Sequence, residues 1–173
     1  MCKFYIKGNN RLSGDVNISS AKNSVLPILA STILADGVSV INNAPNIEDV
    51  YVLCDVLRSL SAEVTIDKNN NIMIDSKKLS DKNIDNDLIG KMRAAFLVLG
   101  PLVARLGKAR ISLPGGCKIG ARPIDLYLKG LKSLGATVKE ECGYVDVTAT
   151  RFVGGTVFLD YPSVGATELL IDR

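Results

Sequence analysis

A cysteine in a glycine-rich loop is the side chain of this sequence best suited to chemistry on a ligand. Cys117 lies in Leu113-Pro-Gly-Gly-Cys-Lys-Ile-Gly-Ala-Arg-Pro123, between an apolar run and the start of a predicted helix. Glycine lets a ligand approach the backbone closely. The charge of Lys118 and the N-terminus of the following helix both favour a thiolate. We therefore predict that Cys117 carries a functional thiol.

The remaining cysteines fit structural roles better. Cys54 falls on the buried face of a predicted helix, where a thiol acts as a small apolar side chain, and Cys2 and Cys142 have no special context. No two cysteines have the close spacing of a zinc site or a redox dithiol. The chain also contains no histidine, which excludes histidine acid–base catalysis and most transition-metal sites. We predict no metal and no cofactor.

Cationic and hydroxyl side chains elsewhere could bind an anion. Arg122 precedes the proline at which a helix begins, so its guanidinium and free backbone N–H groups could meet a phosphate. Lys22 and Asn23 lie among small residues in a predicted loop, and Ser163-Val-Gly-Ala-Thr167 offers hydroxyl and N–H groups. The spacing of Arg93 does not decide between solvent and a cleft. Each of these residues alone could equally be an ordinary surface residue.

The chain contains a duplicated unit that explains how these residues could meet. Leu57-Arg-Ser-Leu-Ser-Ala-Glu-Val64 matches Leu131-Lys-Ser-Leu-Gly-Ala-Thr-Val138, and a short apolar strand precedes each copy. The later copy is longer, and its extra residues fall in the loop that holds Cys117. A scaffold that lengthens at one strand-to-helix loop indicates a site at that loop.

Each copy is predicted to form a strand, a helix and a hairpin. Helical spacing of apolar residues predicts one helix from Ile47, with Asn46 as its cap, and another from Ile124 that stops at Gly135. The predicted hairpins pair 64–66 with 72–74 and 137–140 with 144–147. A further helix is predicted over about 88–106, bent at Gly100-Pro101.

Partial copies of the repeated unit occur at both ends of the chain. Residues 14–18 and 155–159 are predicted strands, each followed by a loop and a helix, and the polar segment 75–87 is a predicted loop. If the repeats share one handedness, their strand-to-helix loops gather on one face. That face would surround a single anionic ligand with Lys22, Cys117, Arg122 and Ser163.

Size and composition favour one enzyme-like domain. A length of 173 residues with 47% apolar residues is ample for a core, and a net charge of +3 is too small for a dedicated nucleic-acid or membrane-surface protein. There is no signal segment, and the longest apolar stretch, 94–104, is too short to span a bilayer. We predict a reduced, cytoplasmic protein with no nucleic-acid and no membrane partner.

The carboxyl-terminal repeat stops inside a predicted helix. Its strand and loop lead into 166–171, and the sequence then ends at Arg173 without a cap or a hairpin. Such a helix would leave Leu169, Leu170 and Ile171 with little to pack on. We therefore interpret the chain as the amino-terminal portion of a larger architecture, and self-association through this apolar end is a hypothesis.

Together these motifs resemble the UDP-N-acetylglucosamine 1-carboxyvinyltransferase family, enolpyruvyl transferases of the EPSP synthase-like superfamily. The resemblance covers essentially the whole chain. It rests on Ser20-Ala-Lys-Asn-Ser-Val-Leu-Pro27, Lys91-Met-Arg-Ala94, Leu99-Gly-Pro-Leu102, the cysteine motif extended to Asp125, and Ser163-Val-Gly-Ala-Thr167. The cysteine motif is highly specific, and the others gain weight from their order.

The resemblance implies an α/β fold of repeated strand-helix-strand-strand units, an inside-out α/β barrel that is truncated here. Residues 22–173 would form most of the first barrel domain, with its third repeat incomplete. Residues 1–21 would join the second domain, which is absent from the sequence.

The implied activity is the transfer of an enolpyruvyl group from phosphoenolpyruvate to the 3-hydroxyl of UDP-N-acetylglucosamine, the first committed step of peptidoglycan synthesis. Cys117 would be the catalytic proton donor, would form an adduct with phosphoenolpyruvate, and would be alkylated by fosfomycin. The implied phosphoenolpyruvate site consists of Lys22, Asn23, Cys117 and Arg122. The implied UDP-sugar site consists of Asn23, Arg93, Arg122, Pro123, Ile124, Asp125, Leu126, Ser163, Val164 and Gly165.

The sequence departs from the family pattern in several places. Tyr161 stands where some relatives carry a basic residue near the UDP phosphates, and Tyr127 replaces a histidine seen in some. The family's aspartate near the attacking hydroxyl, and further arginines that hold phosphoenolpyruvate, fall beyond this sequence. Because positioning and preorganised charge supply most of such catalysis, we expect the isolated chain to have little or no turnover.

Three other functions compete with this interpretation. The sister transferase of the shikimate pathway would need Ser-Lys-Ser where this chain has Ala21-Lys-Asn23, and it has no comparable cysteine loop. The RNA 3′-phosphate cyclases depend on a histidine, and this chain has none. A non-catalytic remnant or ligand-binding half-domain of the same family is the alternative from a different class.

Overall fold

The computed structural model describes residues 3–9, 11–80, 87–88, 92–113 and 124–172. Of the predicted site residues, Cys117, Arg122 and Pro123 lie outside these ranges, and the side chain of Arg93 is not described. Cys2 and part of the polar segment 75–87 also fall outside them.

The first repeat folds as a strand, a helix and a hairpin, as predicted. Its elements are β1 (Val38–Ile41), α2 (Glu48–Ser59), β2 (Glu63–Ile66) and β3 (Ile72–Asp75). β3 pairs antiparallel with both other strands, which gives the order β1-β3-β2. Side chains alternate between the faces of a strand, and Ile72 and Ile74 are 1% and 0% exposed on the face that belongs to the core.

The second repeat has the same topology. Its elements are β4 (Lys108–Ser112), α5 (Asp125–Ser133), β5 (Thr137–Glu141) and β6 (Tyr144–Thr148), in the order β4-β6-β5. Val145 and Val147 on the central strand are fully buried, like the two isoleucines of β3. Gly135 follows α5 with φ +93°, so the predicted glycine stop is confirmed. The strand-helix-strand-strand unit is therefore present in both copies.

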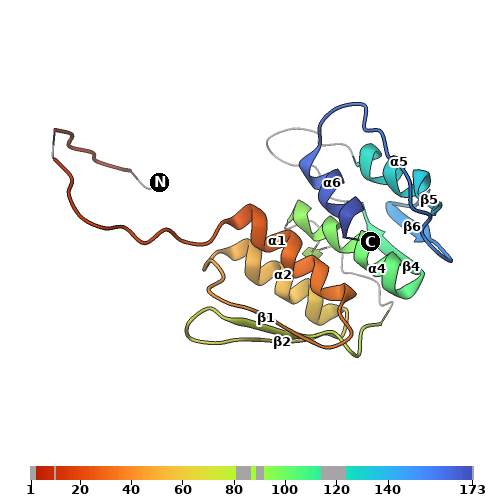
Figure 1. Ribbon diagram of the computed structural model, residues 1–173, viewed down its shortest axis with the longest axis horizontal. Coiled ribbons are helices and arrows are strands. Elements are labelled where there is room, and N and C mark those ends of the chain that lie inside the picture. Colours follow the sequence, from red (N-terminus) through yellow and green to blue (C-terminus); the bar gives the residue numbers. More distant parts are fainter. Residues whose placement is uncertain (1–2, 10, 81–86, 89–91, 114–123, 173) are drawn as a thin grey trace.

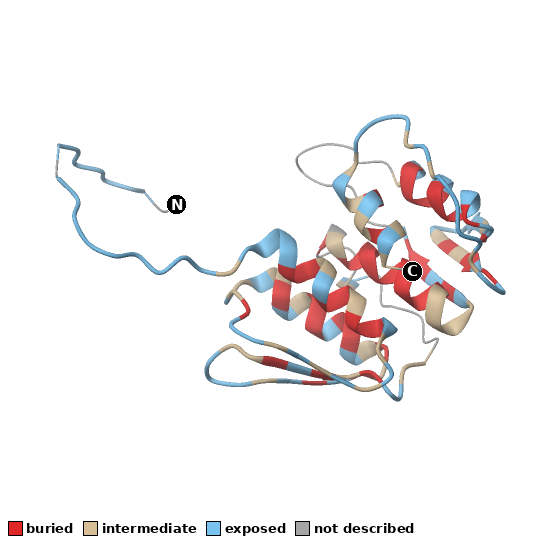
Figure 2. Ribbon diagram, in the orientation of Figure 1, coloured by how far each residue is buried: buried red, intermediate tan, exposed pale blue. Residues whose placement is uncertain are grey.

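A layer of helices joins the two repeats. The elements of this layer are α1 (Lys22–Ser31), the 3₁₀ helices η1 (Thr32–Leu34) and η2 (Arg93–Val98), α4 (Leu99–Leu106) and α6 (Val164–Ile171). α1 lies beside α2, η2 contacts α1, α2 and α6, and α4 contacts β4 (Figure 1). The buried sides of these helices face inward (Figure 2). Leu57 and Leu131, the matched leucines of the two copies, are both fully buried in this core.

The helix predicted over 88–106 is two segments rather than one bent helix. The change from 3₁₀ to α geometry falls between Val98 and Leu99, and not at Gly100-Pro101. Pro101 is the third residue of α4, where a backbone N–H has no intrahelical partner in any case. At this position the proline therefore costs no hydrogen bond within the helix.

The predicted cap of α2 is wrong. The residue before the helix is Ile47, which makes no side-chain cap, and the Asn46 Oδ1 instead accepts a hydrogen bond from the Tyr51 hydroxyl at 3.0 Å. Glu48 and Asp49 in the first turn place carboxylates at the positive end of the helix. This charge arrangement favours the helix start without an asparagine cap.

The predicted strands at 14–18 and 155–159 do not form. A strand requires a neighbour for its backbone hydrogen bonds, and none of the described strands pairs with either segment. Residues 3–9 and 11–19 extend away from the body, and 150–163 pass outside α5 and α6 as an irregular segment (Figures 1 and 2). Val16, Ile18 and Phe158 are 80%, 87% and 83% exposed.

The last helix packs better than its sequence predicted. Leu169 is fully buried beside Gly100 of α4, and Leu170 lies against Gly130 of α5. Ile171 remains 72% exposed. The expectation that all three residues would lack contacts is therefore wrong, because glycines on two neighbouring helices let α6 approach closely.

Candidate functional site

A cavity of about 370 Å³ lies where several helical segments begin. Its polar lining comes from α1 (Lys22, Asn23), α2 (Asp49), α5 (Tyr127) and α6 (Gly165, Glu168). Apolar residues of α1 and η2 complete the wall. The cavity therefore collects residues from both repeats and from the helices that join them.

Four of the lining residues lie in the first turn of a helix. Lys22 is the first residue of α1, Asp49 the second of α2, Tyr127 the third of α5 and Gly165 the second of α6. The first backbone N–H groups of a helix have no intrahelical acceptor, and the N-terminus carries partial positive charge. The first turns of α1, α2 and α6 therefore bring partial positive charge to this cavity, which favours an anion.

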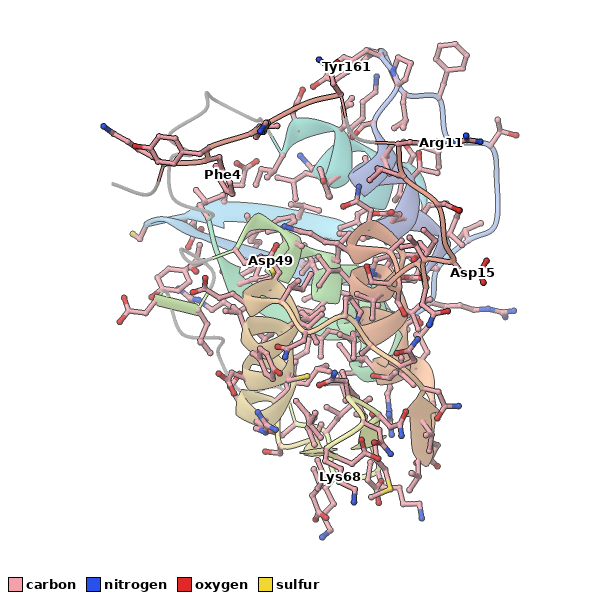
Figure 3. All side chains as sticks on the ribbon, turned by 90° about the vertical axis from the view of Figure 1, so that its left-hand side faces the viewer. Phe4, Arg11, Asp15, Asp49, Lys68 and Tyr161 are labelled. Carbon is pink, nitrogen blue, oxygen red and sulfur yellow. The ribbon has the colours of Figure 1, made fainter. Side chains whose placement is uncertain are left out.

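Lys22 and Asn23 reach this cavity from a helix, and not from the loop that the sequence predicted. They form the first turn of α1, and the Lys22 ammonium pairs with Asp49 Oδ2 on the neighbouring helix. The Lys22 side chain is 54% exposed and that of Asp49 is 30% exposed. Figure 3 shows Asp49 on α2, above the β2–β3 hairpin that carries Lys68. A cation is thus held at the cavity by a residue that sequence reasoning missed.

The segment from Ser163 caps a helix. The Ser163 Oγ accepts a hydrogen bond from the Ala166 N–H at 3.3 Å, and the Thr167 hydroxyl donates to the Ser163 carbonyl at 2.8 Å. Ser163 is therefore the cap of α6. Gly165 lines the cavity, whereas Val164 is 75% exposed.

Tyr127 closes one side of the cavity. Its ring is 9% exposed and packs edge-on against Phe96 of η2, with ring centroids 5.5 Å apart and an angle of 88° between the planes. Its hydroxyl faces Gly165, where a side chain of any size would meet it. The sequence identified Tyr127 only as a departure from the family pattern, and gave no sign of this contact.

Glu168 adds a second carboxyl group to the lining. Burial, followed by the nearby charge of Asp172, raises the pKa of Glu168, and burial likewise raises the pKa of Asp172. No sequence signal pointed to Glu168, because one acidic residue on a short apolar helix usually faces solvent.

Three further residues of the predicted UDP-sugar site, Ile124, Asp125 and Leu126, lie outside this lining. Ile124 and Asp125 line a second cavity, of about 840 Å³, together with Lys129 and Lys132 of the same helix. The side chain of Leu126 is 1% exposed and belongs to the core. Of the predicted site residues that are described, the structure brings Lys22, Asn23 and Gly165 to one cavity, with Ser163 as the cap of the helix that carries Gly165.

Cys54 is a core residue, as predicted. It is fully buried in α2, and this burial raises the pKa of its thiol from 9.0 to about 11, although the charge of Arg58 partly opposes the shift. Cys142 is exposed in the β5–β6 turn, with φ +50°. Neither cysteine lines the cavity.

Alkaline pH is expected to destabilise the protein through Cys54. Above about pH 9 the unfolded chain loses this proton while the folded chain keeps it until about pH 11, so the stabilising contribution is complete below pH 9 and disappears as the pH rises to 11. The loss should be about 2–3 kcal/mol. Urea unfolding at several pH values would measure the free energy of unfolding of the parent and of Cys54→Ala. If this free energy depended on pH in the same way in both proteins, the prediction would be wrong.

The described part of the chain offers no group of three or more histidine, cysteine, aspartate or glutamate side chains that could hold a metal ion. Within the same residues, no helix has the length and apolar character needed to cross a bilayer.

A family comparison matches almost the whole chain. The family model described as EPSP synthase (3-phosphoshikimate 1-carboxyvinyltransferase) matches residues 6–172. UDP-N-acetylglucosamine 1-carboxyvinyltransferase 2 of Clostridium tetani is 51% identical over 172 residues, and UDP-N-acetylglucosamine 1-carboxyvinyltransferase 1 of Clostridium acetobutylicum is also 51% identical. Each match covers 99% of this chain and 41% of the relative, so the chain spans well under half the length of these relatives.

Solved structures show the same fold. The enolpyruvyl transferase NikO from Streptomyces tendae is 27% identical and superposes with a TM-score of 0.78 over 95% of this chain and 39% of its own. EPSP synthase from Acinetobacter baumannii, at 17% identity, superposes with a TM-score of 0.64 over 91% of this chain and 37% of its own. The repeated strand-helix-strand-strand units are therefore those of an enolpyruvyl transferase-like α/β fold.

Proposed function

Because this chain belongs to the EPSP synthase family of enolpyruvyl transferases, we propose that its cavity binds anionic substrates for enolpyruvyl transfer. The proposed donor is phosphoenolpyruvate and the proposed acceptor is the 3-hydroxyl of UDP-N-acetylglucosamine, in cytoplasmic peptidoglycan synthesis. The names of relatives at 51% identity support this choice of acceptor.

One observation carries the proposal, namely the convergence of helix starts and Lys22 on one cavity. Phosphoenolpyruvate carries a phosphate and a carboxylate, and UDP-N-acetylglucosamine carries a diphosphate. Helix N-termini and an ammonium group bind such oxygens. The cavity draws these groups from both repeats, as a site for two substrates requires.

The proposed chemistry is an addition followed by an elimination. The 3-hydroxyl oxygen attacks C2 of phosphoenolpyruvate and loses its proton, while C3 gains one. The tetrahedral adduct then loses phosphate and a C3 proton, which leaves the enol ether. We propose Cys117 as the proton donor to C3 and as the residue that fosfomycin alkylates, with Lys22, Asn23 and Arg122 at the phosphoenolpyruvate.

The remaining site residues are assigned to the UDP-sugar. We propose that Asn23, Arg93, Arg122–Leu126 and Ser163–Gly165 form its site. In this arrangement residues 22–173 supply the first barrel domain and residues 1–21 join a second. A polypeptide of these 173 residues alone is expected to turn over slowly, because it spans 41% of the length of the relatives.

Three measurements on this chain test the proposal. Calorimetric titration with UDP-N-acetylglucosamine should show binding, while phosphate release with both substrates should stay close to background. Mass spectrometry after fosfomycin should place the adduct on Cys117, and Cys54 and Cys142 serve as internal controls because one is buried and the other exposed. The proposal fails if the sugar nucleotide or phosphoenolpyruvate does not bind, or if fosfomycin labels Cys117 no faster than Cys142.

A further inference from the structure

We propose that Asp49 is a positioning residue, which holds the Lys22 ammonium at the cavity so that its remaining donors can bind an anionic ligand. The inference rests on the proposed function, since it assigns a role in the same cavity. It concerns a residue that neither the motifs nor the resemblance singled out.

The position of Lys22 explains why it needs a partner. Lys22 is the first residue of α1, and the first turn of that helix contains no acidic side chain. A cation at this end is disfavoured by the partial positive charge of the helix N-terminus. Asp49 lies in the first turn of α2, where the same effect favours a carboxylate, and its Oδ2 pairs with the ammonium.

The side chains of Asp49 and Lys22 differ in how freely they can move. Asp49 has a short side chain that is 30% exposed, on a helix fixed by Val50 and Leu53, which are 2% and 0% exposed. Lys22 has a four-carbon stem, is 54% exposed, and would otherwise sample many rotamers. Asp49 is therefore the fixed partner, and the ion pair restricts where the ammonium can lie.

Pairing with Asp49 leaves Lys22 able to bind a ligand. A lysine ammonium has three N–H donors, and a single carboxylate oxygen occupies one of them. Lys22 and Asp49 both line the cavity, so the other donors are presented where an anion would enter. The ammonium offsets the charge of Asp49, so that the anion meets a neutral pair beside the first turns of α1 and α2.

The opposite role for Asp49 would be competition with the ligand for Lys22. The two roles differ in the sign of one measurement, which is the affinity for an anion after the charge of Asp49 is removed. Positioning predicts weaker binding without the carboxylate, whereas competition predicts tighter binding.

The test is calorimetric titration of the full chain with phosphoenolpyruvate and with inorganic phosphate. Asp49→Asn should bind both about tenfold more weakly, while its thermal unfolding midpoint falls by no more than about 4 °C, the loss expected of one first-turn carboxylate. Asp49→Glu, which restores the charge, should bind within about threefold of the parent. Asp55→Asn is the matched control, because it makes the same change on the same helix and breaks the 2.8 Å pair with Arg58 outside the cavity. It should leave binding unchanged.

Each outcome decides the matter. If Asp49→Asn binds the anions as tightly as the parent or more tightly, the inference is wrong. It is also wrong if Asp49→Glu binds no better than Asp49→Asn. Neither result contradicts the proposed function. The parent could bind phosphoenolpyruvate, and the variants could show the predicted affinities, while UDP-N-acetylglucosamine does not bind. In that case the proposed function is wrong and the role of Asp49 is supported. If the parent binds neither phosphoenolpyruvate nor phosphate, both fail.

Discussion

Gly100→Ala is expected to lower the free energy of unfolding by about 3 kcal/mol, although alanine is normally the better residue inside a helix. A Cβ atom at this position would lie closer than 3.0 Å to the backbone carbonyl oxygen of Leu169, and 3.2 Å from its Cγ. Backbone cannot rotate aside as a side chain can. α6 would therefore have to move away from α4, which uncovers the fully buried Leu169.

Gly130→Ala provides the matched comparison. Its Cβ would also lie closer than 3.0 Å to a neighbour, but that neighbour is the flexible end of the Leu170 side chain. A rotamer change can relieve this contact, and the helix preference of alanine, about 1 kcal/mol over glycine, offsets the cost. Urea unfolding of both variants should show a large loss for Gly100→Ala and a change within about 1 kcal/mol for Gly130→Ala. Equal losses would show that the close backbone approach is not what matters.

Gly165→Ala is expected to lower the affinity of the cavity for its proposed ligand, UDP-N-acetylglucosamine, by at least about tenfold, or 1.4 kcal/mol. The new methyl group would lie closer than 3.0 Å to the Tyr127 hydroxyl and 3.1 Å from Cζ. The ring is packed against Phe96, so it cannot withdraw into the core. The clash therefore pushes the ring or the start of α6 into the cavity that both residues line.

A second substitution tests whether this contact is the cause. Tyr127→Phe removes the oxygen that makes the shortest contact, so the combination of Gly165→Ala with Tyr127→Phe should recover most of the lost affinity. Calorimetric titration of the parent, both single variants and the pair would give the coupling between the two sites. Additive losses would mean that Gly165 acts on the ligand directly and not through Tyr127.

The repeated core of the fold could be predicted from the sequence because apolar spacing and turn residues agree there. Leu57 and Leu131 occupy matching positions in the two copies and are both fully buried, and both hairpins form where they were predicted. The segments 14–18 and 155–159 have the same apolar character, but a strand also needs a partner, and apolar spacing cannot supply one.

The site was harder to predict than the fold, because it depends on how the elements meet. Lys22 was identified from its small neighbours, yet its contact with Asp49 follows only from the way α1 lies beside α2. Asp49 looked like an ordinary first-turn acid of a helix. Tyr127 and Glu168 likewise reach the cavity through the packing of α5 and α6. The motifs therefore identified part of the lining, and tertiary packing supplied the rest.

The cavity is assembled from segments that lie far apart in the sequence, and this has a consequence for any small molecule that occupies it. Its walls come together only when both repeats have packed against the helical layer. An unfolded or partly folded chain therefore cannot bind the ligand. By mass action, a ligand present at a hundredfold excess over its dissociation constant would add about 2.7 kcal/mol to the folded state. Occupancy would then slow proteolysis and delay aggregation, so an inhibitor of this site would also act as a chaperone for its target.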